Sequence, residues 1–363
     1  MHRLELTKPD GRGLTLYALE AMHDVGPAPS PFLEPLGRFP HLRRHPLRDE
    51  WITYAAYRQD RTFLPPPEYN PLAVTTDAAA PTELPAGSWD VAVFDNRFPS
   101  LSPDAAEAPA SIVETAAGVG KCEVVVFTQD SGSALGRLPL RHIDLLLQVW
   151  ADRTARLAAD PRIAYVLPFE NRGAEVGVTL HHPHGQIYAY PEVPPVPARM
   201  QRVAREYFDA RGRGVLQDHI ANELASGERI LYRGGHAVAF VPACARYPYE
   251  VWVAPIEPVA TFCDLDAATR TDLARALKTV LMKYDALWGR PFPYLMAWYQ
   301  APVDGAPHPE CHLHAEFYPP YRTRDRLKYL AGTELAAGWF AMDALPEDKA
   351  RELQAINVEI DAP

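Results

Sequence analysis

The chain has 363 residues, of which 47% are hydrophobic, and its formal net charge at pH 7 is −10. A chain of this size can bury a large core, and an acidic balance without a basic run argues against nucleic-acid and membrane-surface binding. No apolar run reaches the roughly 18–20 residues that span a bilayer, and Met1–Met22 has no apolar stretch typical of a signal peptide.

The N-terminal segment, residues 1–40, is predicted to be a polar lead-in with one strand at Leu14–Tyr17. A second irregular stretch runs from Phe63 to Trp89 and is dominated by proline, alanine and threonine. This composition favours a loop on the surface. The rest of the chain divides into an N-terminal half, residues 41–195, and a C-terminal half, residues 196–363.

The N-terminal half contains strands around one helix. β-branched and aromatic residues predict strands at Val91–Phe94, Cys122–Phe127 and Ala164–Phe169. Apolar side chains at spacings of three and four predict a helix over Pro139–Ala158. A turn of Asn, Arg and Gly then leads to the sequence LHHPHGQIYAY (Leu180–Tyr190).

The C-terminal half repeats this order. Strands are predicted at Ala237–Val241, Glu250–Val253 and Tyr294–Tyr299, and a helix at Asp266–Leu287. The sequence ECHLHAEFYPP (Glu310–Pro320) follows the last of these strands. His182 and His312 are 130 positions apart (312 − 182), and the pair EVVV at Glu123 and EVWV at Glu250 are 127 apart (250 − 123). Such similar offsets favour an internal duplication over chance ordering, and short connections favour antiparallel pairing. We therefore predict an α+β fold of duplicated units with a largely antiparallel sheet.

The segment His182-Pro-His-Gly-Gln186 carries the candidate chemistry. Residues two apart on a strand face the same side, so His182, His184 and Gln186 are expected to line one face. Neutral imidazole is a nucleophile that needs no separate base, and its attack on phosphorus gives a phosphoramidate. The neighbouring histidine can orient the nucleophile through a ring hydrogen bond. A glutamine at the third position binds phosphate oxygens without transferring protons, which favours group transfer over hydrolysis.

The loop before this segment, Asn171–Thr179, supplies glycines, an amide and a hydroxyl. Backbone N–H groups of such a loop can hold a phosphate. No Gly-Lys-Ser/Thr follows, so it is not a Walker loop. Its place directly before the histidine strand is what makes it a candidate phosphate loop.

The segment FENRGAEVGVTLHHPHGQIYAYP (Phe169–Pro191), together with HAEFYPP (His314–Pro320) and Arg43–Arg61, resembles the galactose-1-phosphate uridylyltransferase family of the histidine-triad superfamily. The resemblance implies two histidine-triad-like αβ halves and a homodimer. It also implies transfer of UMP from UDP-glucose to galactose 1-phosphate, by a ping-pong route through a uridylylated histidine.

The resemblance also implies roles for individual residues. His184 is the nucleophile, His182 supports it or binds metal, and Gln186 holds the transferred phosphate. The other matching positions are Asn171, Gly177 and Thr179 at the phosphate loop, Arg58 and Arg61 near the phosphates and sugar, Phe94 and Asn96 at the uridine, and Lys328 and Glu334 near the hexose, often from the partner subunit. The alternatives are a core position for Phe94 and surface charges for the arginines, Lys328 and Glu334.

The chain departs from the family at both of its metal sites. The family's zinc uses a Cys-x-x-Cys pair and the first histidine of HPH, but Tyr69–Ala73 contains no cysteine and the third-ligand position falls near Ser131. We therefore predict that the structural zinc is absent and that the chemistry needs no cofactor. In the C-terminal half, Tyr299 replaces one histidine ligand. His312, His314 and Glu316 could still bind a metal there, although a polar network is the favoured interpretation.

Other functions remain open at this stage. One is a nucleotidyltransferase or phosphorylase that uses an ADP-sugar or another hexose 1-phosphate. A second is a histidine-triad nucleotide hydrolase, against which Gln186 argues, and a third is a non-catalytic metal-binding protein. The four cysteines form no Cys-x-x-Cys pair and suit a reducing cytoplasm, where we expect the protein to act without membrane or nucleic-acid partners.

Overall fold

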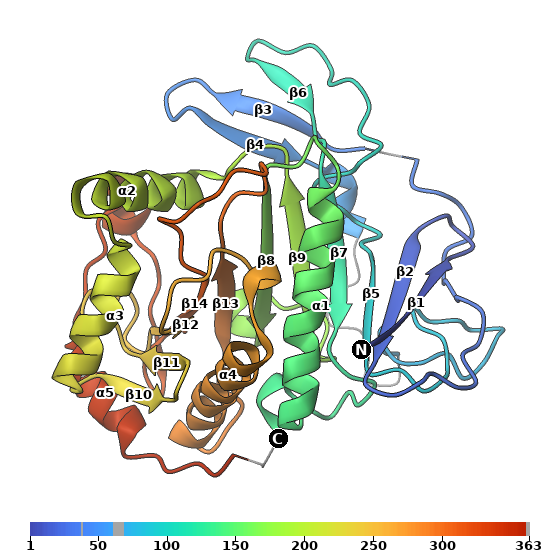
Figure 1. The fold of residues 1–363 in the computed structure, drawn as a ribbon. Helices are drawn as coiled ribbons and strands as arrows, with labels where there is room; N and C mark the ends of the chain where they lie inside the picture. The colour runs from blue at the N-terminus through green and yellow to red at the C-terminus, as the bar shows by residue number, and fades with distance from the viewer. Residues whose placement is uncertain (38, 61–68, 361–363) are drawn as a thin grey trace.

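The computed structural model describes residues 1–37, 39–60 and 69–360. Its main feature is an antiparallel sheet of eleven strands in the order β1-β2-β5-β7-β9-β8-β13-β14-β12-β11-β10 (Figure 1). These strands are β1 (His2–Thr7), β2 (Gly13–Ala18), β5 (Val91–Asp95), β7 (Lys121–Val126), β8 (Tyr165–Arg172), β9 (His184–Tyr190), β10 (Ile230–Arg233), β11 (Ala237–Phe240), β12 (Val251–Pro255), β13 (Tyr294–Tyr299) and β14 (His314–Tyr318).

Two small sheets and five α-helices complete the described fold. The small sheets are β4-β3-β6, from β3 (His41–His45), β4 (Glu50–Tyr54) and β6 (Thr115–Ala117), and β15-β16, from β15 (Tyr321–Thr323) and β16 (Arg326–Leu327). The helices are α1 (Leu140–Ala158), α2 (Pro195–Arg211), α3 (Val215–Ser226), α4 (Ala267–Leu287) and α5 (Pro346–Gln354). The predicted α+β class with a largely antiparallel sheet is confirmed.

Helices α1 and α4 lie against one face of the large sheet and contact each other (Figure 1). The apolar face predicted for α1 is buried, including Ile143, Leu147 and Trp150. Leu277 and Tyr284 of α4 are buried in the same core. Because one core runs beneath both helices, the two halves are expected to unfold together.

The sheet is built from two similar units that meet at its centre, where β8 pairs with β13. One unit runs β7–α1–β8–β9 and the other β12–α4–β13–β14. In each unit the third strand lies between the first and the second, so β9 is flanked by β7 and β8 and β14 by β12 and β13. This order places the strand that begins with His184 between two buried neighbours.

The predicted match of EVVV with EVWV is one residue out of register. Glu123 of β7 lies opposite Ile187, whereas Val251 of β12 lies opposite Phe317, which is the equivalent of Ile187 at the offset of 130. The structural partner of Glu123 is therefore Val251 and not Glu250. A slip of one residue moves a side chain to the other face of a strand, so similar letters at 127 did not mark equivalent positions.

The N-terminal 40 residues contain two strands of the large sheet, since β1 pairs with β2 and β2 with β5. The prediction that Phe63–Trp89 is a surface loop is wrong for the part that the structure describes, residues 69–89. Leu72, Leu84 and Trp89 are buried and form a second core with Leu14 and other residues of β2, β5 and β7. Apolar residues spaced irregularly among prolines gave no periodic signal, although together they cover the face of β2, β5 and β7 that is turned away from α1.

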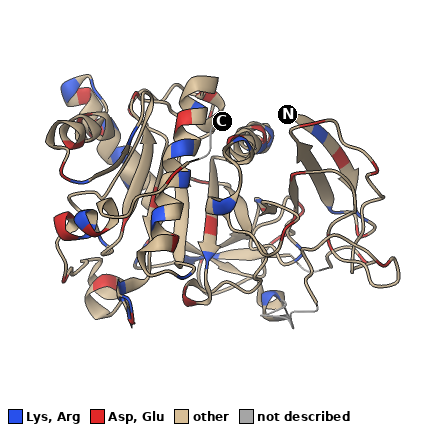
Figure 2. Cartoon of the chain, turned by 90° about the horizontal axis from the view of Figure 1, so that it is seen from below, with Lys and Arg blue, Asp and Glu red and all other residues tan. Residues whose placement is uncertain are grey.

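None of the helices in the described residues combines the length and the apolar character needed to cross a membrane. Seen from below, lysine and arginine positions are interspersed with aspartate and glutamate positions along helices and loops (Figure 2). Many of these charges are paired, such as Arg172 with Asp285 and Arg153 with Glu123.

Candidate active site

His184 stands at the start of β9 and lines a cavity of about 270 Å³. The cavity gathers most of the residues that the sequence predicted for the site. Its lining includes Arg58, Phe94, Asn96, Asn171, Gly177, Thr179, His184 and Gln186. Arg61 lies outside the described residues. These predicted residues come from four parts of the chain: the 3-10 helix Ala56–Asp60, the end of β5, the end of β8 with the loop after it, and β9.

The imidazole of His184 is held by one hydrogen bond. Its Nδ1 lies 2.7 Å from the carbonyl oxygen of His182. A carbonyl oxygen only accepts, so Nδ1 donates its proton and Nε2 keeps a lone pair. Burial lowers the pKa of His184, against the hydrogen bond to His182, which raises it. The ring is therefore neutral at pH 7 and presents a free nitrogen.

Gly185 explains why the strand can pass so close to its neighbours. A Cβ atom at this position would lie 2.7 Å from Cζ of Phe127 and 2.8 Å from the carbonyl oxygen of Phe169. Real Cβ atoms do not approach other atoms so closely, so only glycine fits here. The glycine thus fixes the depth at which His184 and Gln186 sit between β7 and β8.

The ring of His182 does not contact the ring of His184. Its Nε2 donates to the carbonyl oxygen of Thr128 at 2.7 Å, and its Nδ1 accepts from Nδ2 of Asn70 at 2.9 Å. The predicted ring hydrogen bond to the nucleophile is therefore wrong, because the contact comes from the main-chain carbonyl of His182. Both ring nitrogens are used, which leaves no lone pair for a metal ion. Asn70 comes from the segment that the sequence assigned to a surface loop.

The loop between β8 and β9 turns on two glycines with positive φ, Gly173 at 98° and Gly177 at 80°. Such φ values favour glycine. Asn171 lies where β8 meets the loop, and its Oδ1 is buried without a hydrogen-bond partner among the described residues. Asn171 and His184 also line a second cavity of about 340 Å³, to which Arg137 and Arg172 contribute. The histidine therefore borders two cavities that share lining residues.

Phe94 and Asn96 form the opposite wall of the first cavity. Phe94 is buried at the end of β5 but faces the cavity, so it serves both the core and the site. Oδ1 of Asn96 accepts from the backbone N–H of Phe98 at 2.8 Å, and Nη1 of Arg58 donates to the carbonyl oxygen of Phe98 at 2.6 Å. These bonds hold the wall in position relative to β9. On the face of β9 that lines the cavity, His184 is followed by Gln186 and Tyr188.

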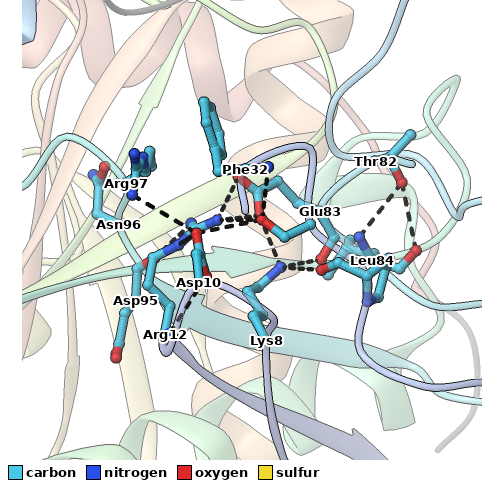
Figure 3. A network of polar contacts seen from close by, with 12 residues as sticks. Lys8, Asp10, Arg12, Phe32, Thr82, Glu83, Leu84, Asp95, Asn96 and Arg97 are labelled. Atoms are coloured by element: carbon cyan, nitrogen blue, oxygen red, sulfur yellow. Dashed lines mark hydrogen bonds and ion pairs between the residues drawn. The ribbon is translucent and has the colours of Figure 1, made fainter. Parts of the chain in front are cut away.

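A buried group of charges, which reaches the first cavity at Glu83, was missed by the sequence analysis (Figure 3). Nζ of Lys8 lies 2.7 Å from Glu83, and the guanidinium of Arg12 lies 2.9 Å from Glu83 and 2.7 Å from Asp10. Arg12 also donates to the carbonyl oxygen of Asp95 at 3.0 Å, between Phe94 and Asn96. The Asp-Gly turn in Lys8–Arg12 could have revealed the β1–β2 hairpin, because this dipeptide is a strong hairpin signal.

Lys328 and Glu334 do not reach either cavity. They lie 3.8 Å apart, and Nζ of Lys328 also donates to the carbonyl oxygen of Ala341 at 2.6 Å. Their exposed fractions are 4% and 8%, so the alternative interpretation as surface charges is wrong. Within one chain they form a pair outside the His184 site.

The second histidine motif reproduces the geometry of the first. Nδ1 of His314 lies 2.7 Å from the carbonyl oxygen of His312, and Nε2 of His312 lies 2.9 Å from the carbonyl oxygen of Pro255. Nε2 of His314, however, lies 3.3 Å from Glu316, whose other oxygen binds Arg246 at 2.9 Å. Burial acts to raise the pKa of Glu316, but its contacts with His314, Tyr318 and Arg246 lower it overall. Glu316 is thus a charged member of a polar network.

The comparisons with known proteins agree on one family. Models described as the N-terminal and C-terminal domains of galactose-1-phosphate uridyl transferase match residues 34–194 and 200–361. The galactose-1-phosphate uridylyltransferase of Thermotoga maritima is 37% identical over 325 residues, which cover 88% of this chain and 99% of the relative. The enzyme of that name from Streptomyces lividans is 39% identical over 289 residues, or 77% of each chain.

Solved structures give the same result. One described as a uridylyltransferase mutant has a TM-score of 0.76 and 31% identity, and covers 87% of this chain and 98% of that chain. An ADP-glucose phosphorylase from Arabidopsis thaliana with bound ADP-glucose has a TM-score of 0.65 over 88% of this chain and 100% of that chain. Its identity of 23% shows a common fold alone.

Proposed function

Because the chain belongs to the galactose-1-phosphate uridylyltransferase family, we propose that it moves UMP from UDP-glucose to galactose 1-phosphate through a covalent intermediate on His184. The observation that carries this proposal is the hydrogen bond of His184 Nδ1 to the carbonyl oxygen of His182, which leaves Nε2 as the nucleophile at the cavity.

The first half-reaction forms a bond between Nε2 of His184 and the α-phosphorus of UDP-glucose. The bond from this phosphorus to glucose 1-phosphate breaks, and glucose 1-phosphate leaves with the electron pair. Nδ1 keeps its proton, so the ring becomes positively charged. The carbonyl oxygen of His182, 2.7 Å from Nδ1, stabilises this charge as it develops.

The second half-reaction reverses the first with a different acceptor. A phosphate oxygen of galactose 1-phosphate attacks the phosphorus, and the N–P bond returns its electrons to Nε2. Gln186, Thr179 and the amide of Asn171 line the space in which the transferred phosphate would lie, and can donate hydrogen bonds to it. None of them is a general base for water, which favours transfer over hydrolysis.

The experiment is a single-turnover labelling of the protein with UDP-glucose carrying radioactive α-phosphate. We expect acid-labile, base-stable label on the wild type and on His236→Ala, a control at an exposed histidine, and none on His184→Ala. Galactose 1-phosphate should release the label as UDP-galactose. Label that persists in His184→Ala would contradict the proposal, and release of free UMP without an acceptor would indicate a hydrolase. ADP-glucose in place of UDP-glucose tests the preference for the base.

The proposed enzyme needs no cofactor for this chemistry and holds no zinc at His182. The use of both ring nitrogens of His182 by Asn70 and Thr128 supports the second statement. Metal analysis of the purified protein, with His182→Ala as the comparison, tests it: zinc that is bound by the wild type and lost in the variant would contradict it. A metal at His312, His314 and Glu316 is disfavoured because both carboxylate oxygens of Glu316 already have partners, Oε1 in His314 and Oε2 in Arg246 and Tyr318.

The proposed enzyme is a cytoplasmic homodimer, without membrane or nucleic-acid partners, in which Lys328 and Glu334 serve the partner's site. Neither residue lines a cavity at His184 in its own chain, so a role at this site would have to be at that of the partner. Mixing His184→Ala subunits with Glu334→Gln subunits tests this arrangement. Activity regained on subunit exchange is expected, whereas no recovery in a mixed dimer, or a monomer in light scattering, would contradict it.

A further inference from the structure

The loop between β13 and β14 holds a cluster of metal-ligating side chains that the transfer reaction does not use. It is the counterpart, in the C-terminal half, of the candidate phosphate loop between β8 and β9. One ligand atom each from His308, Glu310 and Cys311 lies within 4.8 Å of the other two. A turn closed by the backbone N–H of Cys311 and the carbonyl oxygen of His308, at 3.0 Å, brings these residues together.

His308 is oriented as a metal-bound histidine usually is. Its Nε2 lies 2.9 Å from Oδ1 of Asp304, and its Nδ1 lies 3.1 Å from Oε1 of Glu310. Without a metal ion, both ring N–H groups can donate to these carboxylates. A cation would replace the proton on Nδ1, whereas Asp304 would keep the proton on Nε2 and so hold Nδ1 toward Glu310 and Cys311.

Glu310 provides an independent indication of a cation. Its side chain is buried, and Oε1 accepts from Arg205 of α2 at 2.6 Å. Oε2 is also buried, but no group among the described residues donates a hydrogen bond to it. An unpaired carboxylate oxygen in such a place is costly unless a cation or donor satisfies it.

We propose that His308, Glu310 and Cys311 bind a divalent transition metal ion, zinc by the chemistry of the ligands, with water in the fourth position. Nδ1 of His308, Oε2 of Glu310 and the thiolate of Cys311 are the ligands, and the proton on Nδ1 and the thiol proton both pass to solvent on binding. Imidazole, carboxylate and thiolate are the ligands that zinc uses, at bonds of about 2.0–2.3 Å.

The charges of this site balance. The carboxylate and the thiolate together neutralise a divalent ion, so Arg205 can stay on Oε1 beside an uncharged complex. The ion would then connect the β13–β14 loop with α2 through Glu310 and Arg205 (Figure 1). Its role is structural, because neither cavity at His184 is lined by these three residues.

Cobalt(II) tests the site, because a thiolate ligand gives cobalt a strong near-ultraviolet charge-transfer band. The intact protein is stripped of metal with a chelator and titrated with cobalt(II) chloride. We expect one equivalent to produce the band in the wild type and in Cys263→Ser, a control at an exposed cysteine, and not in Cys311→Ser. No band in the wild type, or a band that survives in Cys311→Ser, would overturn the proposal.

Asp304→Asn provides a test that does not alter a ligand. Asp304 is exposed, so the variant is expected to fold, and zinc affinity should fall 10- to 100-fold, as is usual for a group that orients a ligand. Unchanged affinity in a competition assay with a chromogenic chelator would contradict the proposal. Labelling of His184 in the same preparations separates this result from the proposed transfer reaction, which can fail or succeed independently.

Discussion

The two histidine strands of this molecule, β9 and β14, have nearly the same main-chain geometry but different surroundings. In each, Nδ1 of the second histidine bonds to the carbonyl oxygen two residues earlier, and Nε2 of the first bonds to a carbonyl oxygen near the neighbouring strand. The difference lies at the nitrogen that remains. Nε2 of His184 faces a cavity, whereas Nε2 of His314 meets Glu316. The duplicated backbone thus positions an imidazole, and its neighbours decide whether it can react.

Removing the two equivalent imidazoles is expected to show the largest difference. His184→Ala should lower kcat for UMP transfer by about 10⁶-fold, as loss of a nucleophile does in other enzymes. His314→Ala should leave kcat within about twofold, because it contacts neither cavity at His184. Steady-state kinetics of both purified variants measures the effect. Equal losses in the two variants would mean that the halves are not functionally distinct.

Exchange of the third residue of the motif sharpens the comparison. Gln186→Glu places in β9 the carboxylate that β14 carries at Glu316, next to the negative charge of the transferred phosphate. We expect kcat to fall about 10²- to 10³-fold, the usual effect of losing a donor to a developing anion. Glu316→Gln is the matched control and should leave kcat unchanged. A Gln186→Glu variant with wild-type kcat would show that Gln186 does not contact the phosphate.

The sequence predicted much of this arrangement and missed a definable part. Periodic segments such as α1 and β13 were predicted well, because each has one regular apolar face or run. The glycine loop and His184 were found because they are contiguous in sequence. Asn70, Lys8 and Glu83 were not assigned roles, because their importance arises from contacts with residues far away in the chain. Irregular segments lack the periodicity on which such predictions depend.

A further difference between the halves lies at Glu170, and the pH dependence of folding stability tests it. Phe169 lies opposite Gln186 and Ala297 opposite Glu316, so Trp298 is the equivalent of Glu170. Burial raises the pKa of Glu170 to about 7, although Arg172 and a hydrogen bond from Tyr294 oppose the shift. Because the folded state holds this proton more tightly, its contribution to stability is complete below about pH 4.5 and is lost as the pH rises to about 7.

Glu170→Gln should remove this dependence. The stability of the wild type relative to the variant is expected to fall by about 3 kcal/mol between pH 4.5 and 7, since one pKa unit corresponds to about 1.4 kcal/mol. Urea unfolding of both proteins at a series of pH values measures the difference. Parallel stability curves for the two proteins would show that Glu170 titrates normally.

Asn70 offers the smallest and most local way to make the first half resemble the second. Its amide satisfies Nδ1 of His182, whereas Nδ1 of His312 is buried without a partner among the described residues. In Asn70→Ala, Nδ1 of His182 would lose its hydrogen-bond partner and so match Nδ1 of His312. We expect a loss of about 1–3 kcal/mol in unfolding free energy, the usual cost of an unsatisfied buried group. Thr76→Ala, at an exposed position of the same segment, is the control in urea unfolding. Asn70→Ala should also lower kcat, because the carbonyl oxygen of His182 holds the nucleophile. A variant with unchanged stability and unchanged kcat would show that the segment around Asn70 does not support the site.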